Sequence, residues 1–167
     1  SNAVAAAIEQ HGRIDILINS AGVYPRAPIL QISEEQWRLD LDVTVLGTYF
    51  MMVAAINHMR AQGRGHIVNV SSIDAFVAHP GNAHYAATKA AVVSLTRSFA
   101  LEVAHYGILV NSVAPGPMAT ERAKQSDWYD DMVAGLPTGK PIEPAEVADL
   151  VAYLCREDNV SITGENV

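Results

Sequence analysis

Cysteine, charged residues and aromatic residues are all scarce in this chain of 167 residues. The single cysteine excludes an intramolecular disulfide and favours a reducing compartment, so we expect a cytoplasmic protein. Charged residues make up only 17% of the chain, and 18 acidic residues outnumber 11 basic ones to give a net charge of −7. Because phosphate recognition needs clustered Lys and Arg, this balance argues against a nucleic-acid partner.

Long apolar runs are also lacking. None reaches the ~18 residues that a bilayer requires, so we expect no association with a membrane. Half of the residues are nevertheless hydrophobic, which is typical of a globular chain rather than a disordered one. The length allows one substantial core, and we expect residues 1–167 to form a single domain. Residues 1–3 resemble the remnant of a cleaved tag and are set aside.

Short apolar runs alternate with helix-like stretches along the chain. The runs that predict buried strands cover residues 14–19, 66–71 and 108–113. The predicted helices cover residues 4–11, 34–60, 83–106 and 144–156. A capping box of Ser33 and Gln36 begins the second helix, whose apolar positions are Leu39, Val43, Leu46 and Phe50. This alternation predicts an α/β fold: a Rossmann-like, doubly wound parallel sheet with helices on both faces.

Polar or glycine-marked segments follow all three predicted strands. They are Asn19 to Gly22, the pair Ser71 and Ser72, and the pair Pro115 and Gly116. In a parallel sheet these ends meet at one edge, where ligands bind in such folds. The sequence therefore predicts a binding site at the carboxyl ends of the strands.

A phenol and an ammonium lie four residues apart at Tyr85 and Lys89, on one face of a predicted helix. A nearby cation favours phenolate, so we expect Lys89 to lower the pKa of Tyr85 and suit it to exchange protons with an alcohol or carbonyl oxygen. Alone, such a pair is more often part of a solvated helix face.

Other motifs in the sequence favour a functional role for Tyr85 and Lys89. Ser72 lies thirteen residues before Tyr85, a turn of Asn19, Ser20, Ala21 and Gly22 follows an earlier strand, and Pro115-Gly116 precedes Thr120. In this order the motifs resemble the single-domain branch of the short-chain dehydrogenase/reductase family, and lean towards its 3-oxoacyl-carrier-protein reductase-like members. The resemblance extends over nearly the whole chain, to residues 162–165.

The resemblance implies a function and a set of roles. It implies a hydride transfer between NAD or NADP and a small ketone or secondary alcohol. Tyr85 would be the general acid/base, Lys89 would lower its pKa and bind the nicotinamide ribose, and Ser72 would hold the substrate oxygen. Residues 118–140 would form a mobile lid. The implied cofactor-binding residues are Asn19, Ala21, Gly22, Tyr85, Lys89, Pro115, Gly116 and Thr120.

The chain departs from the family at two places. Thr44 stands where the family has an Asn, and a hydroxyl lacks the separate donor and acceptor of an amide, so we expect a weakened proton relay. A packed helix residue is an equal alternative for Thr44. The Gly-rich turn that receives the pyrophosphate is absent, as is the residue that selects NAD or NADP. We therefore expect an incomplete sheet without its first strands and its last, which leaves the strand at 14–19 unpaired.

Two alternatives to an active oxidoreductase stay open. One is a fragment that folds and oligomerises without binding dinucleotide. A weaker one is an epimerase or dehydratase of the extended branch, which the turn at residues 19–22 disfavours. As in the family, we expect a homodimer or homotetramer, formed through the long helices at about 42–60 and 84–106.

Residues outside these motifs receive simpler interpretations. We expect no metal site, because His79 and His84 have no carboxylate or cysteine at ligand spacing and are typical of solvated loop histidines. Asp74 is expected on a surface loop, and Cys155 in the core.

Overall fold

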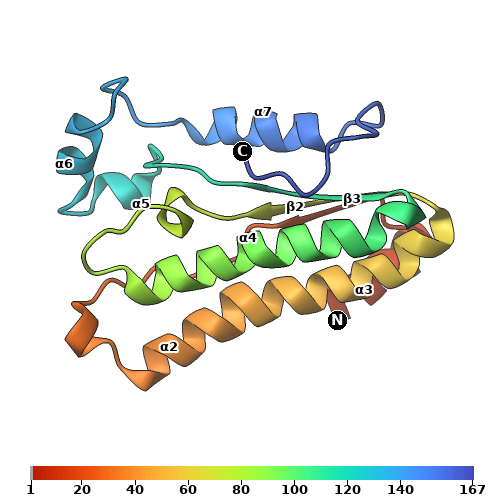
Figure 1. Ribbon diagram of the computed structural model, residues 1–167, viewed down its shortest axis with the longest axis horizontal. Helices are drawn as coiled ribbons and strands as arrows, with labels where there is room; N and C mark the ends of the chain where they lie inside the picture. Colours follow the sequence, from red (N-terminus) through yellow and green to blue (C-terminus); the bar gives the residue numbers. More distant parts are fainter. Residues whose placement is uncertain (1) are drawn as a thin grey trace.

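Three parallel strands form the centre of the fold (Figure 1). The computed structural model describes residues 2–167, and the strands follow in the order β1 (Ile16–Asn19), β2 (Gly65–Val70) and β3 (Ile108–Val113). Leu17 lies opposite Ile67, and Val68 opposite Asn111. The predicted parallel α/β sheet is therefore confirmed.

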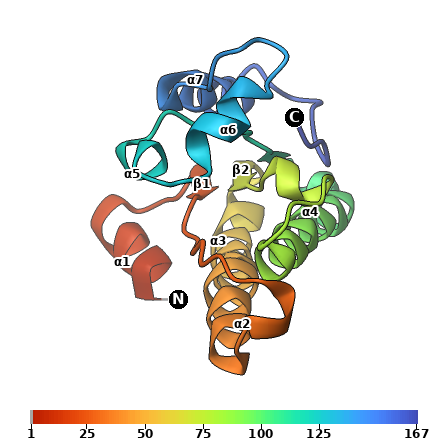
Figure 2. The same cartoon turned by 90° about the vertical axis from the view of Figure 1, so that its left-hand side faces the viewer.

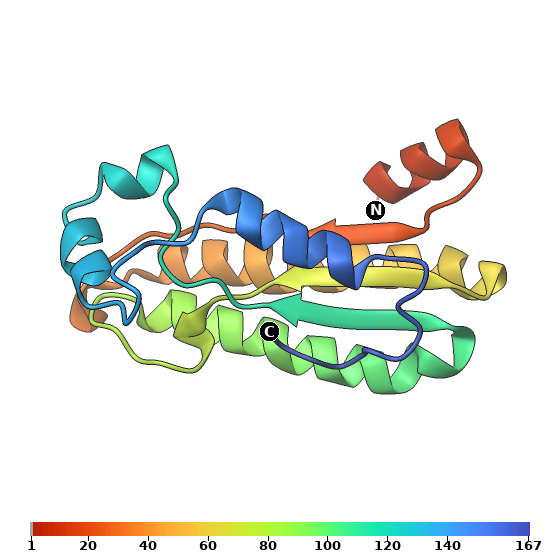
Figure 3. The same cartoon turned by 90° about the horizontal axis from the view of Figure 1, so that it is seen from above.

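Helices cover both faces of the sheet. α3 (Gly47–Gln62) and α4 (Ala83–Val103) lie on one face, and α7 (Pro144–Leu154) lies on the other (Figures 1 and 2). α1 (Asn2–His11) lies beside β1, at the edge of the sheet (Figure 3). All three strands point towards the end that carries the short helices α5 (Glu121–Lys124) and α6 (Tyr129–Ala134).

Burial explains the apolar runs of the central and last strands. Every residue of β3 is buried, because α4 covers one side of it and α7 the other. The cluster under α3 and α4 comprises Leu17, Met52, Ala55, Ile56, Met59, Ile67, Ala100, Val103, Ile108 and Val110. The smaller cluster under α7 comprises Val68, Val113, Val151 and Leu154, with Cys155 packed against it at its edge.

β1 differs from its neighbours because it pairs on one side only, with β2. Leu17 is buried, whereas Ile16 and Ile18 are 45% and 50% exposed. The expectation of a fully buried strand is therefore wrong for one face. The expectation of an unpaired edge is confirmed.

The helix boundaries follow local sequence chemistry. The Ser33 hydroxyl accepts a hydrogen bond from the Gln36 amide, and the Gln36 side chain accepts one from the Ser33 amide, so the capping box is confirmed. Pro144 occupies the start of α7, where its missing N–H costs nothing. α4 runs into a 3-10 turn (Ala104–Tyr106) and stops at Gly107.

The long helix before β2 changes geometry along its length. It consists of α2 (Glu34–Asp40), a π-helical stretch (Leu41–Leu46) and α3. Its buried face carries residues at spacings of three and four, and not the apolar positions read from the sequence, since Leu39, Leu46 and Phe50 are exposed. The buried residues are Asp40, Thr44, Thr48, Met52, Ala55, Ile56 and Met59.

The same helical segment, Glu34–Gln62, is long and apolar enough to cross a membrane by length and composition alone. An 18-residue window within it has a mean hydropathy of 1.6. The expectation that no apolar stretch is long enough to span a bilayer is therefore wrong by length and mean hydropathy. In the structure α3 packs against the strands and α4, which is the position of a core helix.

The two ends of the chain are placed differently. Ser1 lies outside the described residues, and Asn2 and Ala3 lie in the first turn of α1, so the interpretation of residues 1–3 as a tag remnant stays a prediction. The C-terminal segment lies along β3: the Asn111 side chain bonds the Ile162 carbonyl and the Glu165 amide, and Asn166 forms a parallel bridge to Ser112. The predicted approach to a further strand thus begins pairing at Asn166.

Gly107 provides a test of the turn that joins α4 to β3. Its φ is +74°, and an added Cβ would overlap the Gly63 carbonyl oxygen. We expect Gly107→Ala to lower the free energy of unfolding by about 3 kcal/mol, because it adds a steric clash to an unfavourable left-handed backbone. Gly12→Ala is the matched control: its φ is +76° with open space around it, so we expect a loss of about 1 kcal/mol. Equal losses in urea unfolding would contradict the steric argument.

Candidate active site

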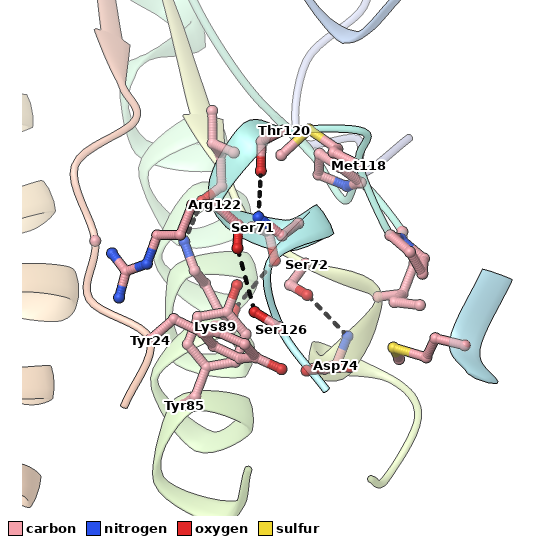
Figure 4. A pocket seen from close by; sticks show the side chains of 18 of the residues that line it. Tyr24, Ser71, Ser72, Asp74, Tyr85, Lys89, Met118, Thr120, Arg122 and Ser126 are labelled. Atoms are coloured by element: carbon pink, nitrogen blue, oxygen red, sulfur yellow. Dashed lines mark hydrogen bonds between the residues drawn. The ribbon is translucent and has the colours of Figure 1, made fainter. Parts of the chain in front are cut away.

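A cavity of about 310 Å³ lies at the carboxyl ends of the strands (Figure 4). Its walls come from the segments after β1, β2 and β3, from the start of α4, and from the region of α5 and α6. The predicted site residues in its lining are Gly22, Ser72, Tyr85, Lys89, Pro115, Gly116 and Thr120. Segments far apart in the sequence therefore meet here, as the strand ends predicted.

Tyr85 and Lys89 enter the cavity from the first turns of α4. Lys89 is only 4% exposed, and its Nζ donates a 2.7 Å hydrogen bond to the carbonyl of Val70, the last residue of β2. The same Nζ lies 5.6 Å from the centre of the Tyr85 ring. The four-residue spacing thus places both groups at one site, as predicted.

Burial controls the proton affinity of both groups. It raises the pKa of Tyr85 to about 12, although a hydrogen bond with Ser72 opposes the rise. Burial also lowers the pKa of Lys89 to about 8, against the attraction of the Asp40 carboxylate. The expectation that Lys89 lowers the pKa of Tyr85 is therefore wrong for this structure, because desolvation of the phenolate dominates.

The two serines after β2 have different partners. Ser72 lines the cavity, lies close enough to the phenol of Tyr85 to lower its pKa, and accepts a 3.1 Å hydrogen bond from the Asp74 amide. Ser71 donates to the backbone carbonyl of Lys89 at 3.2 Å, which ties α4 to the end of β2. Of the two serines, Ser72 is thus the one whose side chain lies near the Tyr85 phenol.

The site also contains a polar network that the sequence did not reveal. The Asp74 carboxylate is buried, lies 2.7 Å from Nδ1 of His79, and accepts a 2.8 Å hydrogen bond from Asn82. The Asn82 amide also donates to the Tyr24 phenol, whose ring packs edge-on against Tyr85 at 4.5 Å. The assignment of Asp74 to an exposed loop is therefore wrong, because its carboxylate holds the loop that carries His79.

The two histidines near Tyr85 differ in position. His79 lies in the loop before α4, as expected, but is partly buried against Asp74, whereas His84 is fully buried at the start of α4. The expectation of a solvated loop residue is therefore wrong for His84, because the helix already begins at Ala83. Among the described residues, no three or more His, Cys, Asp or Glu side chains group to hold a metal.

Some predicted site residues lie next to the cavity rather than in its lining. Asn19 turns its amide towards Asn69 and donates a 2.8 Å hydrogen bond, and Ala21 is exposed. Thr44 is buried in the π-helical stretch behind Gly22. A Cβ on Gly22 would lie 3.5 Å from Nζ of Lys89 and 3.8 Å from Oγ1 of Thr44, so a glycine at this position keeps the approach to Lys89 open.

Residues 118–132 contribute one wall of the cavity, through α5 and α6, and the mobility of residues 118–140 as a lid stays a prediction. Thr120 caps α5 by accepting a 3.1 Å hydrogen bond from the Ala123 amide. Trp128 packs against Tyr24 with ring centres 6.1 Å apart, and the guanidinium of Arg26 lies 5.5 Å from the Trp128 ring. Aromatic contacts therefore connect this wall to the segment after β1.

Comparison with known proteins identifies the family. A family model described as enoyl-(acyl carrier protein) reductase matches residues 1–167. Oxidoreductase UcpA of Escherichia coli K12 is 39% identical over 176 residues, which cover 96% of this chain and 67% of that protein. The 3-oxoacyl-(acyl-carrier-protein) reductase FabG of Thermotoga maritima is 32% identical over 164 residues, which cover 97% of this chain and 67% of that protein. The chain belongs to the short-chain dehydrogenase/reductase family, as its motifs indicated.

Solved structures agree with this membership. The NADP complex of ElxO has a TM-score of 0.93 at 32% identity and covers 99% of this chain and 69% of its own. NAD⁺-bound xylitol dehydrogenase has a TM-score of 0.91 at 28% identity, covering 99% of this chain and 71% of its own. Proteins of this fold therefore bind either NADP or NAD⁺. The chain spans about two thirds of the length of the curated relatives it matches.

The buried ammonium of Lys89 predicts a gain in stability when it is removed. Burial lowers its pKa from 10.5 to about 8, so a protonated Lys89 lowers the free energy of unfolding. This loss of stability is complete below about pH 8 and vanishes as the pH rises to 10.5. We expect Lys89→Met to raise the free energy of unfolding by about 2 kcal/mol at pH 7, after the lost hydrogen bond to Val70 is subtracted.

Urea unfolding at pH 7 and pH 9.5 measures this effect, and the gain should shrink at the higher pH. Lys140→Met is the matched control, because Lys140 is exposed and its replacement should change little. A Lys89→Met variant less stable than the parent at pH 7 would show that the ammonium stabilises the fold.

Proposed function

We propose that the protein is an NAD- or NADP-dependent oxidoreductase that interconverts a ketone and a secondary alcohol. The observation that carries this proposal is the convergence of Ser72, Tyr85 and Lys89 on one cavity at the strand ends. A phenol, a hydroxyl and a buried cation around one space are the groups needed to move a proton to a carbonyl oxygen and to stabilise charge on it.

The residues of the cavity fit the nicotinamide half of the cofactor. Gly22 leaves the approach to Lys89 open, and Pro115, Gly116 and Thr120 form the opposite wall. When bound, the reduced nicotinamide supplies a hydride, that is, the two electrons of the reaction. Lys89 would hold the ribose hydroxyls, and Thr120 would lie near the carboxamide.

The proton follows a separate path from the hydride. Tyr85 donates its phenolic proton to the carbonyl oxygen as the carbonyl carbon receives the hydride, and Ser72 donates a hydrogen bond to the same oxygen. The product is the alcohol, and Tyr85 regains its proton from solvent. The high pKa of Tyr85, about 12, keeps it protonated and so suited to the reductive direction.

The substrate side of the cavity is largely apolar. Tyr24, Ile73, Met118, Trp128 and Met132 contribute rings, a branched chain and thioethers to the lining. We therefore propose a small substrate with an apolar or aromatic body beside its carbonyl group. The buried Asp74 carboxylate, already bonded by Asn82, disfavours a substrate with a negative charge there.

The role of Tyr85 leads to a direct test in the full-length protein. We expect Tyr85→Phe to lower turnover by at least about 100-fold, because the general acid is lost, and to leave the fold intact. The measurement is oxidation of NADH or NADPH in the presence of a panel of apolar ketones. Ser72→Ala should lower turnover while leaving nucleotide binding unchanged. Full activity in Tyr85→Phe would contradict the assignment.

A second candidate is a folded module that oligomerises without binding dinucleotide. The free edge of β1, with Ile16 and Ile18 half exposed, favours it because such an edge can pair with another chain. Titration with NADH and NADPH separates the candidates: saturable binding supports the enzyme, and no binding at millimolar nucleotide supports the module. A cytoplasmic location remains part of the proposal for either candidate.

The apolar outer face of the long helix supports the proposed homo-oligomer. Leu46 and Phe50 are exposed there, and the Phe50 ring packs against Tyr49, which in turn contacts Phe99 of α4. The exposed residues thus form a surface across α3 and α4, the two helices expected at the interface. Apolar surfaces of this kind mark sites of protein association.

We expect Phe50→Glu to shift the protein to a smaller assembly, because a carboxylate would have to be desolvated at the interface. Sedimentation velocity measures the shift. Val160→Glu is the matched control, since Val160 is also an exposed apolar residue but lies after α7, away from both helices. An unchanged sedimentation coefficient in Phe50→Glu would place the interface elsewhere.

A further inference from the structure

A buried pair of ionisable residues lies behind the catalytic groups. Asp40 of α2 and His84 of α4 are both 0% exposed. Neither carboxylate oxygen of Asp40 and neither ring nitrogen of His84 has a hydrogen-bond partner within the described chain. Burying such groups costs several kcal/mol, and an apolar residue at either position would avoid that cost. Their presence therefore calls for a functional explanation.

The two side chains face each other across the helix pair. Nε2 of His84 lies 3.7 Å from Oδ2 of Asp40, which is beyond hydrogen-bond distance but within reach of an ion pair when the histidine is protonated. Trp37, also on α2, covers the histidine with ring centres 6.1 Å apart. Neither Asp40 nor His84 lines the cavity, so substrate does not reach them.

The pair is nevertheless connected to the catalytic residues through α4. His84 directly precedes Tyr85 on this helix, and it lies five residues before Lys89. Asp40 precedes Thr44 by four residues, so both lie on the buried stripe of the long helix. A Cβ on Gly22 would lie within 4 Å of both Thr44 Oγ1 and Lys89 Nζ, so the stripe that carries Asp40 approaches Lys89.

The charges around Asp40 act in opposite directions. Burial raises the pKa of Asp40, while His84 and Lys89 oppose this rise. The Asp40 carboxylate in turn opposes the lowering of the Lys89 pKa that burial causes. It also contributes to the raised pKa of Tyr85, together with Asp74 and Tyr24 on the cavity side.

We propose that Asp40 is a positioning residue whose carboxylate, which faces His84 behind the active site, favours the charged ammonium of Lys89. The proposal deepens the proposed oxidoreductase function and rests on it for its purpose. His84 faces the carboxylate at 3.7 Å, and its interaction with Asp40 opposes the rise in the Asp40 pKa that burial causes. Lys89 then carries a positive charge at neutral pH despite its burial, and can hold the ribose hydroxyls of the cofactor beside Tyr85.

The test follows the titration of Lys89 directly, without need of a substrate. This chain contains three lysines, Lys89, Lys124 and Lys140, and Lys89→Met assigns the Lys89 signal in the ¹³C-lysine spectrum of the full-length protein. In Asp40→Asn, which keeps the shape and removes the charge, we expect the midpoint of Lys89 to fall by about one pH unit. An unchanged midpoint would overturn the proposal.

His84 acts through Asp40, so its effect should depend on Asp40. We expect His84→Gln to lower the Lys89 midpoint by less than Asp40→Asn does, and the double variant to match Asp40→Asn alone. Additive effects of the two substitutions would contradict this order of action. Asp42→Asn is the matched control, because Asp42 is exposed two residues along the same helical segment and its loss should leave the midpoint unchanged.

A purely structural role would give a different pattern. Asp40→Leu combined with His84→Leu replaces the pair by apolar side chains that fill the buried site, and so keeps a folded protein available if Asp40→Asn unfolds. The proposal expects the lowered Lys89 midpoint in this variant too. A wild-type midpoint there would show that the pair serves only packing.

The pH dependence of turnover distinguishes failure of this inference from failure of the proposed function. In carbonyl reduction we expect the alkaline limb of kcat/KM to move to lower pH in Asp40→Asn, because loss of the carboxylate lowers the pKa of both Lys89 and Tyr85. An inactive Tyr85→Phe beside an unshifted Asp40→Asn profile would overturn the inference alone. An active Tyr85→Phe would overturn the proposed function.

Discussion

The burial of the Lys89 ammonium is the constraint on which the site depends. Removing a cation from water is costly, and here the Val70 carbonyl and the Asp40 carboxylate offset only part of that cost. The hydrogen bond to Val70 and the Ser71 bond to the Lys89 carbonyl hold the first turns of α4 against the sheet. This attachment places Tyr85 beside Ser72, so the catalytic geometry follows from how one lysine is buried.

The long helix packs behind the site, and the polar residues that it buries there lower the stability of the fold. Its buried stripe is apolar from Met52 onwards, where it faces the strands, and polar at Asp40, Thr44 and Thr48, where it faces the start of α4. The π-helical stretch lies within the polar part of this stripe, between Asp40 and Thr48, and such stretches are frequent at functional sites. Stability is thus concentrated at one end of the helix pair and function at the other.

Local patterns allowed the strands and the meeting of Tyr85 and Lys89 to be predicted from the sequence. Apolar runs marked all three strands, and the spacing of Tyr85 and Lys89 predicted that both reach one cavity, because spacing along a helix survives folding. The burial of Asp40 and His84 could not be predicted, since it depends on which face of the long helix meets α4. The expectation of a buried Phe50 was wrong for the same reason: the residue is apolar but faces outwards. The pKa of Tyr85 depends on desolvation by distant segments, which no local spacing encodes.

The most direct test of the account is whether reduced nicotinamide binds in the cavity beside Trp128. Of the two tryptophans in this chain, Trp128 lies in the cavity wall, so the difference between the parent and Trp128→Phe isolates its emission. The measurement is Trp128 emission of the full-length protein during titration with NADH and NADPH. The account predicts saturable quenching with energy transfer to one of the two nucleotides. Unchanged emission with both at millimolar concentration would contradict it.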